Sequence, residues 1–208
     1  ESLCLISDEV YEDRVFDCAE KLFSLADIPA LRKRVIRLFS FSKTYAMTGW
    51  RIGYLHSDQS VVAEILKVHD SLVTCAPVVS QYAAMGALET ADEDVKRFNA
   101  QYRLRRDLMC SRLDRLPEFF RYQKPTSAYY VFPKVLQPDL FEENDEFLGS
   151  LSWRSALGLL SSVQVVTVPG VAFGQNGEEH IRLSFGKTEE EINRAFDRIE
   201  AYCRGRLS

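Results

Sequence analysis

The chain has 208 residues, of which 46% are apolar, and its formal net charge at pH 7 is −4. This length allows one large domain or two small ones, and the apolar fraction is ordinary for a globular protein with a core. The mild net charge indicates neither a nucleic acid nor an acidic membrane surface as a partner. No apolar run reaches the length of a membrane-spanning helix, so no membrane partner is predicted.

The cysteines and histidines carry no pattern of a disulfide framework or a metal site. The five cysteines are scattered and none forms a C-x-x-C pair, which predicts reduced, mostly packing residues of an intracellular, cytoplasmic protein. The three histidines lack the spacing of metal ligands, so no metal is predicted and surface or capping roles are expected. They are His56, His69 and His180.

The first part of the chain alternates predicted strands with predicted helices. Apolar runs predict short strands over residues 3–6, 35–39 and 51–56. Asp58 is a predicted N-cap for a helix to about residue 71, and Pro77 opens a second predicted helix. This alternation predicts an α/β fold with a parallel or mixed sheet.

The second part predicts a compact α+β domain. The segment Thr90–Glu93 has the form of a capping box before a long helix that reaches about residue 116. The arginines of that helix are expected to form a solvated face. A second capping box is predicted at Thr188–Glu191. The remaining expectations are strands over residues 128–135, 163–168 and 180–185, helices over 142–160 and 189–204, and loops over 137–145 and 174–179.

The segment from residue 40 to residue 54, SFSKTYAMTGWRIGY, places one lysine in a polar turn. Hydroxyls at Ser40 and Ser42 precede Lys43, and Arg51 follows it. A lysine that forms an imine needs nearby positive charge, which lowers its pKa so that the free amine is available. Hydroxyls and a guanidinium suit a phosphate group. The alternative is a surface lysine in a Ser/Thr-rich turn, but the combination is typical of a pyridoxal-phosphate (PLP) site.

This segment closely resembles the cofactor-lysine motif of the class I/II aminotransferases, the fold-type I PLP enzymes. The resemblance implies that Lys43 forms the Schiff base with the cofactor. It also implies that Ser40, Ser42 and Arg51 hold the cofactor phosphate.

The segment Ile6-Ser-Asp8-Glu9-Val-Tyr11 follows the first predicted strand, and ligands of open α/β sheets gather at the carboxyl ends of strands. It resembles the Asp-Glu-x-Tyr motif of the same family. The resemblance implies that Asp8 pairs with the pyridinium nitrogen of PLP and that Tyr11 donates to the phenolic oxygen of its ring. A turn or capping role for Asp8 is the alternative, and Glu9 is expected to be structural.

The segment Ile181-Arg182-Leu-Ser184-Phe185 alternates apolar and polar residues, which places Arg182 and Ser184 on one face of a strand. It resembles the C-terminal Arg-Leu/Ile-Ser/Cys-Phe motif of the family, whose arginine binds the α-carboxylate of the substrate. A surface salt bridge is the alternative for Arg182. The segment from residue 125 to residue 130, which ends in Tyr129 and Tyr130, also resembles a family segment, and Ser127 stands where glycine is common in it. If this position requires a positive φ, serine is expected to conflict with it.

The resemblance covers the chain but only the C-terminal portion of the family fold. It implies part of the PLP-transferase large-domain mixed sheet over residues 1–90, a connecting helix over 91–116 and a small α+β C-terminal domain over 117–208. The chain is expected to be a segment of a longer protein, because it opens with Glu and runs directly into a strand.

The implied function is transfer of an amino group between an amino acid and a 2-oxo acid, with PLP as cofactor and a homodimer as the full-length assembly. A PLP-dependent lyase or synthase of the same fold and a non-catalytic, truncated remnant remain alternatives.

Overall fold

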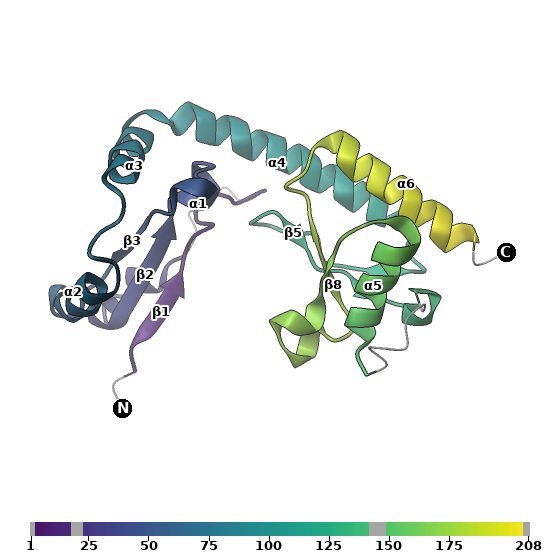
Figure 1. Ribbon diagram of the computed structural model, residues 1–208, viewed down its shortest axis with the longest axis horizontal. Helices are drawn as coiled ribbons and strands as arrows, with labels where there is room; N and C mark the ends of the chain where they lie inside the picture. The colour runs from purple at the N-terminus through teal and green to yellow at the C-terminus, as the bar shows by residue number, and fades with distance from the viewer. Residues whose placement is uncertain (1–2, 18–22, 142–148, 206–208) are drawn as a thin grey trace. The chain divides into compact units, whose positions relative to one another are not determined.

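The computed structural model describes residues 3–17, 23–141 and 149–205 (Figure 1). The chain divides into two compact units, Glu1–Asn99 (unit 1) and Ala100–Ser208 (unit 2). The three domain segments predicted from the sequence remain a prediction.

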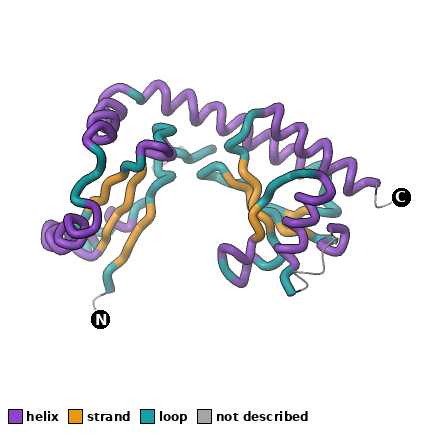
Figure 2. Tube along the Cα trace, viewed as in Figure 1, coloured by secondary structure: helices purple, strands orange, loops and turns teal. Residues whose placement is uncertain are grey.

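Unit 1 contains a three-stranded mixed sheet with the order β1-β2-β3 (Figure 2). The strands are β1 (Leu5–Asp8), β2 (Val35–Ser40) and β3 (Gly53–His56). The central strand β2 runs parallel to β1 and antiparallel to β3. The sequence prediction of a mixed sheet is therefore confirmed, with β1 ending at Asp8 and not at residue 6.

The helices that begin in unit 1 are α1 (Phe41–Thr44), α2 (Gln59–Val73), α3 (Val78–Thr90) and α4 (Asp92–Leu113), of which α4 continues into unit 2. The predicted caps have different outcomes. Asp58 caps α2, since its carboxylate accepts a hydrogen bond of 3.0 Å from the backbone N–H of Ser60. The capping box predicted at Thr90 is wrong: Thr90 is the last residue of α3, and its hydroxyl donates to the carbonyl oxygen of Gly86.

Unit 2 contains two small antiparallel sheets. The strands are β4 (Phe120–Arg121), β5 (Tyr130–Val131), β6 (Lys134–Val135), β7 (Val168–Pro169) and β8 (Ile181–Ser184). They form a β4-β6 pair and a sheet of the order β5-β8-β7. The single strand predicted over residues 128–135 is wrong, because Pro133 separates β5 from β6 and the two strands pair with different partners.

Two helices complete unit 2, α5 (Leu151–Val163) and α6 (Glu189–Gly205). Ser150 caps α5, and the earlier start predicted at residue 142 lies outside the described residues. The strand predicted over residues 163–168 is wrong over most of its length, because Val163 ends α5 and the strand β7 begins only at Val168. The capping box before α6 is confirmed: Thr188 and Glu191 exchange hydrogen bonds between side chain and backbone.

The two units differ in how much apolar surface they bury. Unit 1 buries few large apolar side chains, whereas unit 2 encloses a larger core between α4, α5, α6 and its strands. Most of the large apolar side chains that stay exposed belong to unit 1, including Leu72 of α2 at 76% and Tyr82 of α3 at 70%. Monomeric soluble proteins rarely leave an apolar face of this extent exposed.

Two sequence expectations concern membrane-spanning helices and the burial of the cysteines. No described helix has the length and apolar character needed to cross a membrane. The thiols of Cys110 and Cys203 are buried, as the packing prediction expected, whereas Cys4 and Cys75 are exposed. Cys18 lies outside the described residues.

Gly53, the first residue of β3, lies where β2 and β3 approach closely. A Cβ atom on Gly53 would lie 2.4 Å from the carbonyl oxygen of Phe39, whereas a Cβ on Gly49 would meet nothing within 4 Å. We expect Gly53→Ala to destabilise unit 1 by about 1–3 kcal/mol, the usual range for overpacking. Trp50 and Trp153 are the only tryptophans, so urea unfolding followed by fluorescence in a Trp153→Phe background reports on unit 1.

Gly49→Ala is the matched control and should leave the free energy of unfolding nearly unchanged. Equal unfolding midpoints for the two alanine variants would contradict the close approach of β2 and β3.

Candidate functional site

Three strand ends meet at one edge of the unit 1 sheet. The parallel register pairs Asp8, the last residue of β1, with Leu38 of β2. The antiparallel register pairs Ser40, the last residue of β2, with Gly53. The carboxyl ends of β1 and β2 and the amino end of β3 therefore lie together, which is where ligands of such sheets gather.

Lys43 lies on a one-turn helix directly beyond this edge. The helix α1 begins because the Ser40 hydroxyl oxygen accepts a hydrogen bond of 3.2 Å from the backbone N–H of Ser42. The carbonyl oxygen of Lys43 accepts a hydrogen bond of 2.7 Å from the guanidinium of Arg14, which is only 2% exposed. Backbone contacts thus hold the position from which the Lys43 side chain extends.

Phe41 anchors the same turn to the rest of unit 1. Its backbone N–H donates to the carbonyl oxygen of Ile52, just before β3, and its carbonyl oxygen accepts from the N–H groups of Tyr45 and Met47. The Phe41 ring is 4% exposed and belongs to a buried cluster with Met47 and Ala84 of α3. The turn that bears Lys43 is therefore held by backbone hydrogen bonds at both ends and by the packing of the Phe41 ring.

Two residues of this turn adopt the left-handed conformation without being glycine. They are Ala46, with φ 54°, and Arg51, with φ 52°. Each such residue costs on the order of 1–2 kcal/mol, and such strain gathers at functional sites. Arg51 is exposed, and its Nη1 donates to the carbonyl oxygen of Thr48 at 2.7 Å, its one hydrogen bond with described residues.

Asp8 and Tyr11 of the predicted Asp-Glu-x-Tyr motif lie at and just after the end of β1. Asp8 is exposed at the sheet edge, where one of its carboxylate oxygens accepts a 3.4 Å hydrogen bond from the N–H of Val10. Tyr11 is half-buried in the turn that follows β1. Asp8, Ser40, Ser42, Lys43 and Arg51 therefore belong to one sheet edge and the turn beyond it.

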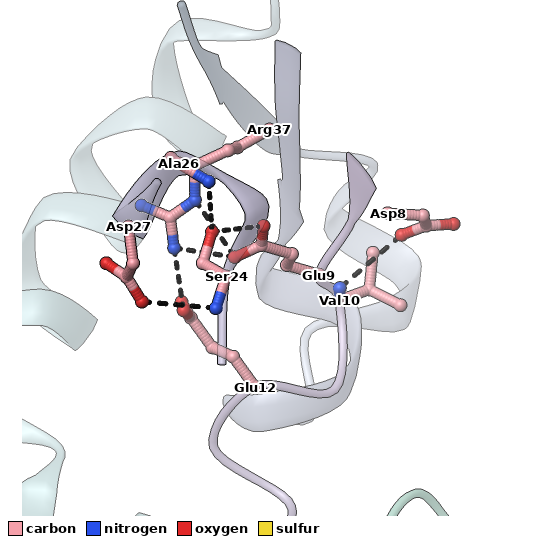
Figure 3. A network of polar contacts seen from close by, with 8 residues as sticks. All are labelled: Asp8, Glu9, Val10, Glu12, Ser24, Ala26, Asp27 and Arg37. Carbon is pink, nitrogen blue, oxygen red and sulfur yellow. Dashed lines mark hydrogen bonds and ion pairs between the residues drawn. The ribbon is translucent and has the colours of Figure 1, made fainter. Parts of the chain in front are cut away.

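Glu9 points into a buried polar network, as expected for a structural residue (Figure 3). Its carboxylate accepts hydrogen bonds from Arg37 at 2.6 and 2.9 Å and from the Ser24 hydroxyl at 2.7 Å. Burial raises the pKa of Glu9, but the hydrogen bonds from Arg37 and Ser24 outweigh it and hold the pKa below the ordinary value. The network ties the chain after β1 to the middle of β2.

Arg182 lies in β8 of unit 2, on the same strand face as Ser184. Its guanidinium carbon lies 4.2 Å from the centre of the Tyr130 ring and 4.6 Å from that of the Phe173 ring. Cation–π contacts of this kind restrict a guanidinium and leave its N–H groups able to form a fork around a carboxylate.

The conflict expected at Ser127 is absent, because the positive φ falls one residue later. Ala128 has φ 62°, and Ser127 does not adopt the left-handed region. The strained residue directly precedes the two tyrosines whose second ring lies against Arg182.

Sequence reasoning missed Arg14 and the two rings around Arg182. Arg14 carries no motif signal, because its role depends on a backbone contact with Lys43. Tyr130 and Phe173 belong to segments that resemble the family, but nothing in the sequence pairs them with Arg182. Within the described residues, no group of three or more His, Cys, Asp or Glu side chains could hold a metal ion.

Comparison with known proteins gives the family. The model of the family "Aminotransferase class I and II" matches residues 1–199. Aromatic-amino-acid aminotransferase 2 of Thermococcus litoralis is 36% identical over 202 residues, which cover 95% of this chain and 48% of that protein. Aspartate aminotransferase of Pyrococcus abyssi is 34% identical over 206 residues, covering 97% and 49% respectively.

A solved structure agrees with these matches. The aromatic aminotransferase from Pyrococcus horikoshii OT3 superposes with a TM-score of 0.87 at 32% identity, covering 99% of this chain and 52% of that one. The chain belongs to the class I and II aminotransferase family, whose members depend on PLP. It spans about half the length of the curated relatives it matches.

The network around Glu9 predicts a pH-dependent stability. A carboxylate whose pKa is lowered on folding stabilises the protein above its unfolded pKa, near 4.5, and loses this contribution as the pH falls through the folded value. We expect Glu9→Gln to lower the free energy of unfolding at pH 7 by about 2 kcal/mol, the scale of hydrogen bonds to a charged group. Urea unfolding followed by Trp50 fluorescence in the Trp153→Phe background, between neutral and acidic pH, measures both effects.

The difference between wild type and Glu9→Gln should shrink on acidification. Glu64 provides the matched control, since its ion pair with Lys67 is exposed and such pairs contribute little. A Glu9→Gln variant as stable as Glu64→Gln at pH 7 would show that the network does not stabilise unit 1.

Proposed function

We propose that this chain is the C-terminal portion of a PLP-dependent aminotransferase, which moves an amino group between an amino acid and a 2-oxo acid. The observation that carries the proposal is the meeting of three strand ends at one sheet edge, with Asp8 and Ser40 on it and Lys43 on the turn directly beyond. Family membership supports the same reaction class.

The donors at this edge fit PLP. The Ser40 hydroxyl uses its oxygen as an acceptor from Ser42, which leaves its own O–H to donate. Together with the Ser42 hydroxyl and the Arg51 guanidinium, it provides the hydrogen-bond donors that a phosphate group requires. The exposed carboxylate of Asp8 suits a protonated ring nitrogen, and the Tyr11 hydroxyl suits the phenolic oxygen of the ring.

When bound, PLP withdraws electrons from the substrate and so makes the Cα proton acidic. In the proposed mechanism Lys43 would hold the cofactor, and its free amine would take the proton from Cα as a general base. Asp8 would keep the ring nitrogen protonated by accepting its hydrogen bond. Arg182 orients the substrate by binding its α-carboxylate, and the rings of Tyr130 and Phe173 restrict the guanidinium for this role.

We also propose that the full-length protein is a cytoplasmic homodimer that binds neither nucleic acid nor membranes. The exposed apolar side chains of α2 and α3 support association with further polypeptide, because a soluble monomer rarely leaves such a face uncovered. The mild net charge supports the absence of a nucleic-acid partner.

The proposed role of Lys43 predicts selective labelling. The full-length protein is incubated with PLP and reduced with borohydride, and its peptides are mapped by mass spectrometry. We expect one pyridoxyl adduct, on Lys43, because its turn is the one held beside the phosphate-binding donors. Lys43→Ala should lose the adduct and turnover, whereas Lys67→Ala, a variant of an exposed lysine, should keep both.

Labelling spread over many lysines, or undiminished turnover in Lys43→Ala, would overturn the assignment. The same experiment on the 208-residue chain tells whether this portion alone forms the cofactor pocket, and an unlabelled chain would mean that the pocket needs the rest of the full-length protein.

Aminotransferase chemistry also predicts a dependence on an amino acceptor. With an amino acid as donor, the full-length enzyme should form product beyond one turnover only when a 2-oxo acid is present. Steady-state assays with and without the 2-oxo acid measure this. Release of pyruvate and ammonia from cystathionine without any acceptor would identify a lyase instead.

A further inference from the structure

A basic pocket of about 800 Å³ lies in unit 2, apart from the residues assigned to cofactor binding. Arg121, Lys124 and Lys134 line it, together with His180 and hydroxyl-bearing residues that include Ser127. None of the described residues that line it is acidic. The charged side chains that line the pocket are therefore all basic.

Backbone pairing places three of these basic residues in a row. The β4-β6 register pairs Arg121 with Lys134, and a further antiparallel bridge pairs Lys134 with His180. Directly opposite residues project from the same face, with Cβ atoms about 4.5–5.5 Å apart, and like charges in such positions destabilise a sheet. The register thus gathers basic side chains on one face, and Glu179 compensates part of their charge through its ion pair with Lys134.

Compensation within unit 2 is incomplete. Lys134 pairs with the exposed Glu179, and Lys124 pairs with Asp107 at 2.8 Å. Arg121 makes no ion pair with any residue in the described part of the chain. The exposed guanidinium of Arg121 therefore remains available to a ligand.

His180 adds a buried polar atom that lacks a partner. Its ring stacks on Phe132 with centroids 5.0 Å apart and planes 5° from parallel. Its Nδ1 is buried and has no hydrogen-bond partner among the described residues. Burial lowers the pKa of His180, and Lys134 and Arg121 lower it further while Glu179 partly offsets them. The ring thus lies near two cations and one carboxylate.

We propose that this pocket is an anion-binding site, in which Arg121, Lys134 and His180 bind a carboxylate, phosphate or sulfate group. Arg182, which has a proposed carboxylate-binding role of its own, lies on β8 two residues after His180, about 7 Å along the chain. It adjoins the pocket, because Tyr130 both contacts Arg182 and lines the pocket. The anionic group has two sources, a free small anion or the second acidic group of a molecule held by Arg182. The second source rests on the proposed function.

Sulfate is the probe, because it stays dianionic at every pH used. The 208-residue chain with isotope-labelled histidines is titrated with sulfate, and the side-chain NMR signals of His180 are followed. We expect a saturable shift of His180 with no saturable shift of His56 or His69, which lie in unit 1. Affinity should rise as the pH falls and His180 becomes protonated, because bound sulfate favours the charged ring.

Substitutions locate the site. Arg121→Gln should weaken sulfate binding by about tenfold or more, as expected for losing a charge-assisted contact. Arg194→Gln is the matched control, since Arg194 is exposed on α6 and outside this pocket. His180→Phe keeps an aromatic ring beside Phe132, and intrinsic fluorescence should then show weaker sulfate binding without the rise at low pH.

The absence of a saturable His180 shift, or equal weakening by Arg121→Gln and Arg194→Gln, would overturn the proposal. Titration with glutarate separates the two sources. A free-anion site loses affinity only in Arg121→Gln, whereas a molecule that spans both groups also loses affinity in Arg182→Gln. Sulfate binding needs no cofactor, so a failure of Lys43 labelling would leave this result intact.

Discussion

The pairing of β2 with a parallel strand on one side and an antiparallel strand on the other is the constraint on which unit 1 depends. Because β1 and β2 run the same way, both deliver their last residues to one edge, and because β3 runs back, it starts there. Residues far apart in the sequence, Asp8 and Ser40, are thereby brought to the same edge by strand pairing.

The buried polar network around Glu9 also stabilises the position of the residues at this sheet edge. Glu9 turns inward to Arg37 while its neighbour Asp8 turns outward, as alternation along a strand and its extension requires. The buried carboxylate of Glu9 therefore fixes the chain directly beside the exposed carboxylate of Asp8. Arg14 has a similar role for Lys43, since its guanidinium binds the backbone carbonyl oxygen of Lys43 and so fixes the position from which that side chain extends.

The sequence was sufficient for features that depend on local chemistry. Asp58 and Thr188 cap their helices because a side chain beside the first turn reaches its N–H groups whatever the tertiary fold. The cap predicted at Thr90 is wrong for a local reason too. The Thr90 hydroxyl donates to the carbonyl oxygen of Gly86, one turn back in α3, and does not cap the helix that follows. The strand expected over residues 128–135 fails at Pro133, which lacks the N–H that a continuous ladder needs.

Features that depend on distant partners could not be read from the sequence. The rings that enclose Arg182 come from β5 and from the turn after β7, and no periodicity links those segments. The row formed by Arg121, Lys134 and His180 likewise exists only through strand register. The roles of Lys43, Asp8, Tyr11, Ser40, Ser42, Arg51 and Arg182 remain predictions that this geometry supports.

The uncovered apolar surface of α2 and α3 has a consequence for how the isolated chain responds to temperature. Attraction between apolar surfaces weakens on cooling, because it is driven by water and not by direct bonding. Contacts between copies that depend on Leu72 and Tyr82 should therefore loosen in the cold and strengthen on warming. Clustering of this chain would then be reversible by chilling, in contrast to aggregates held by interlocking strands.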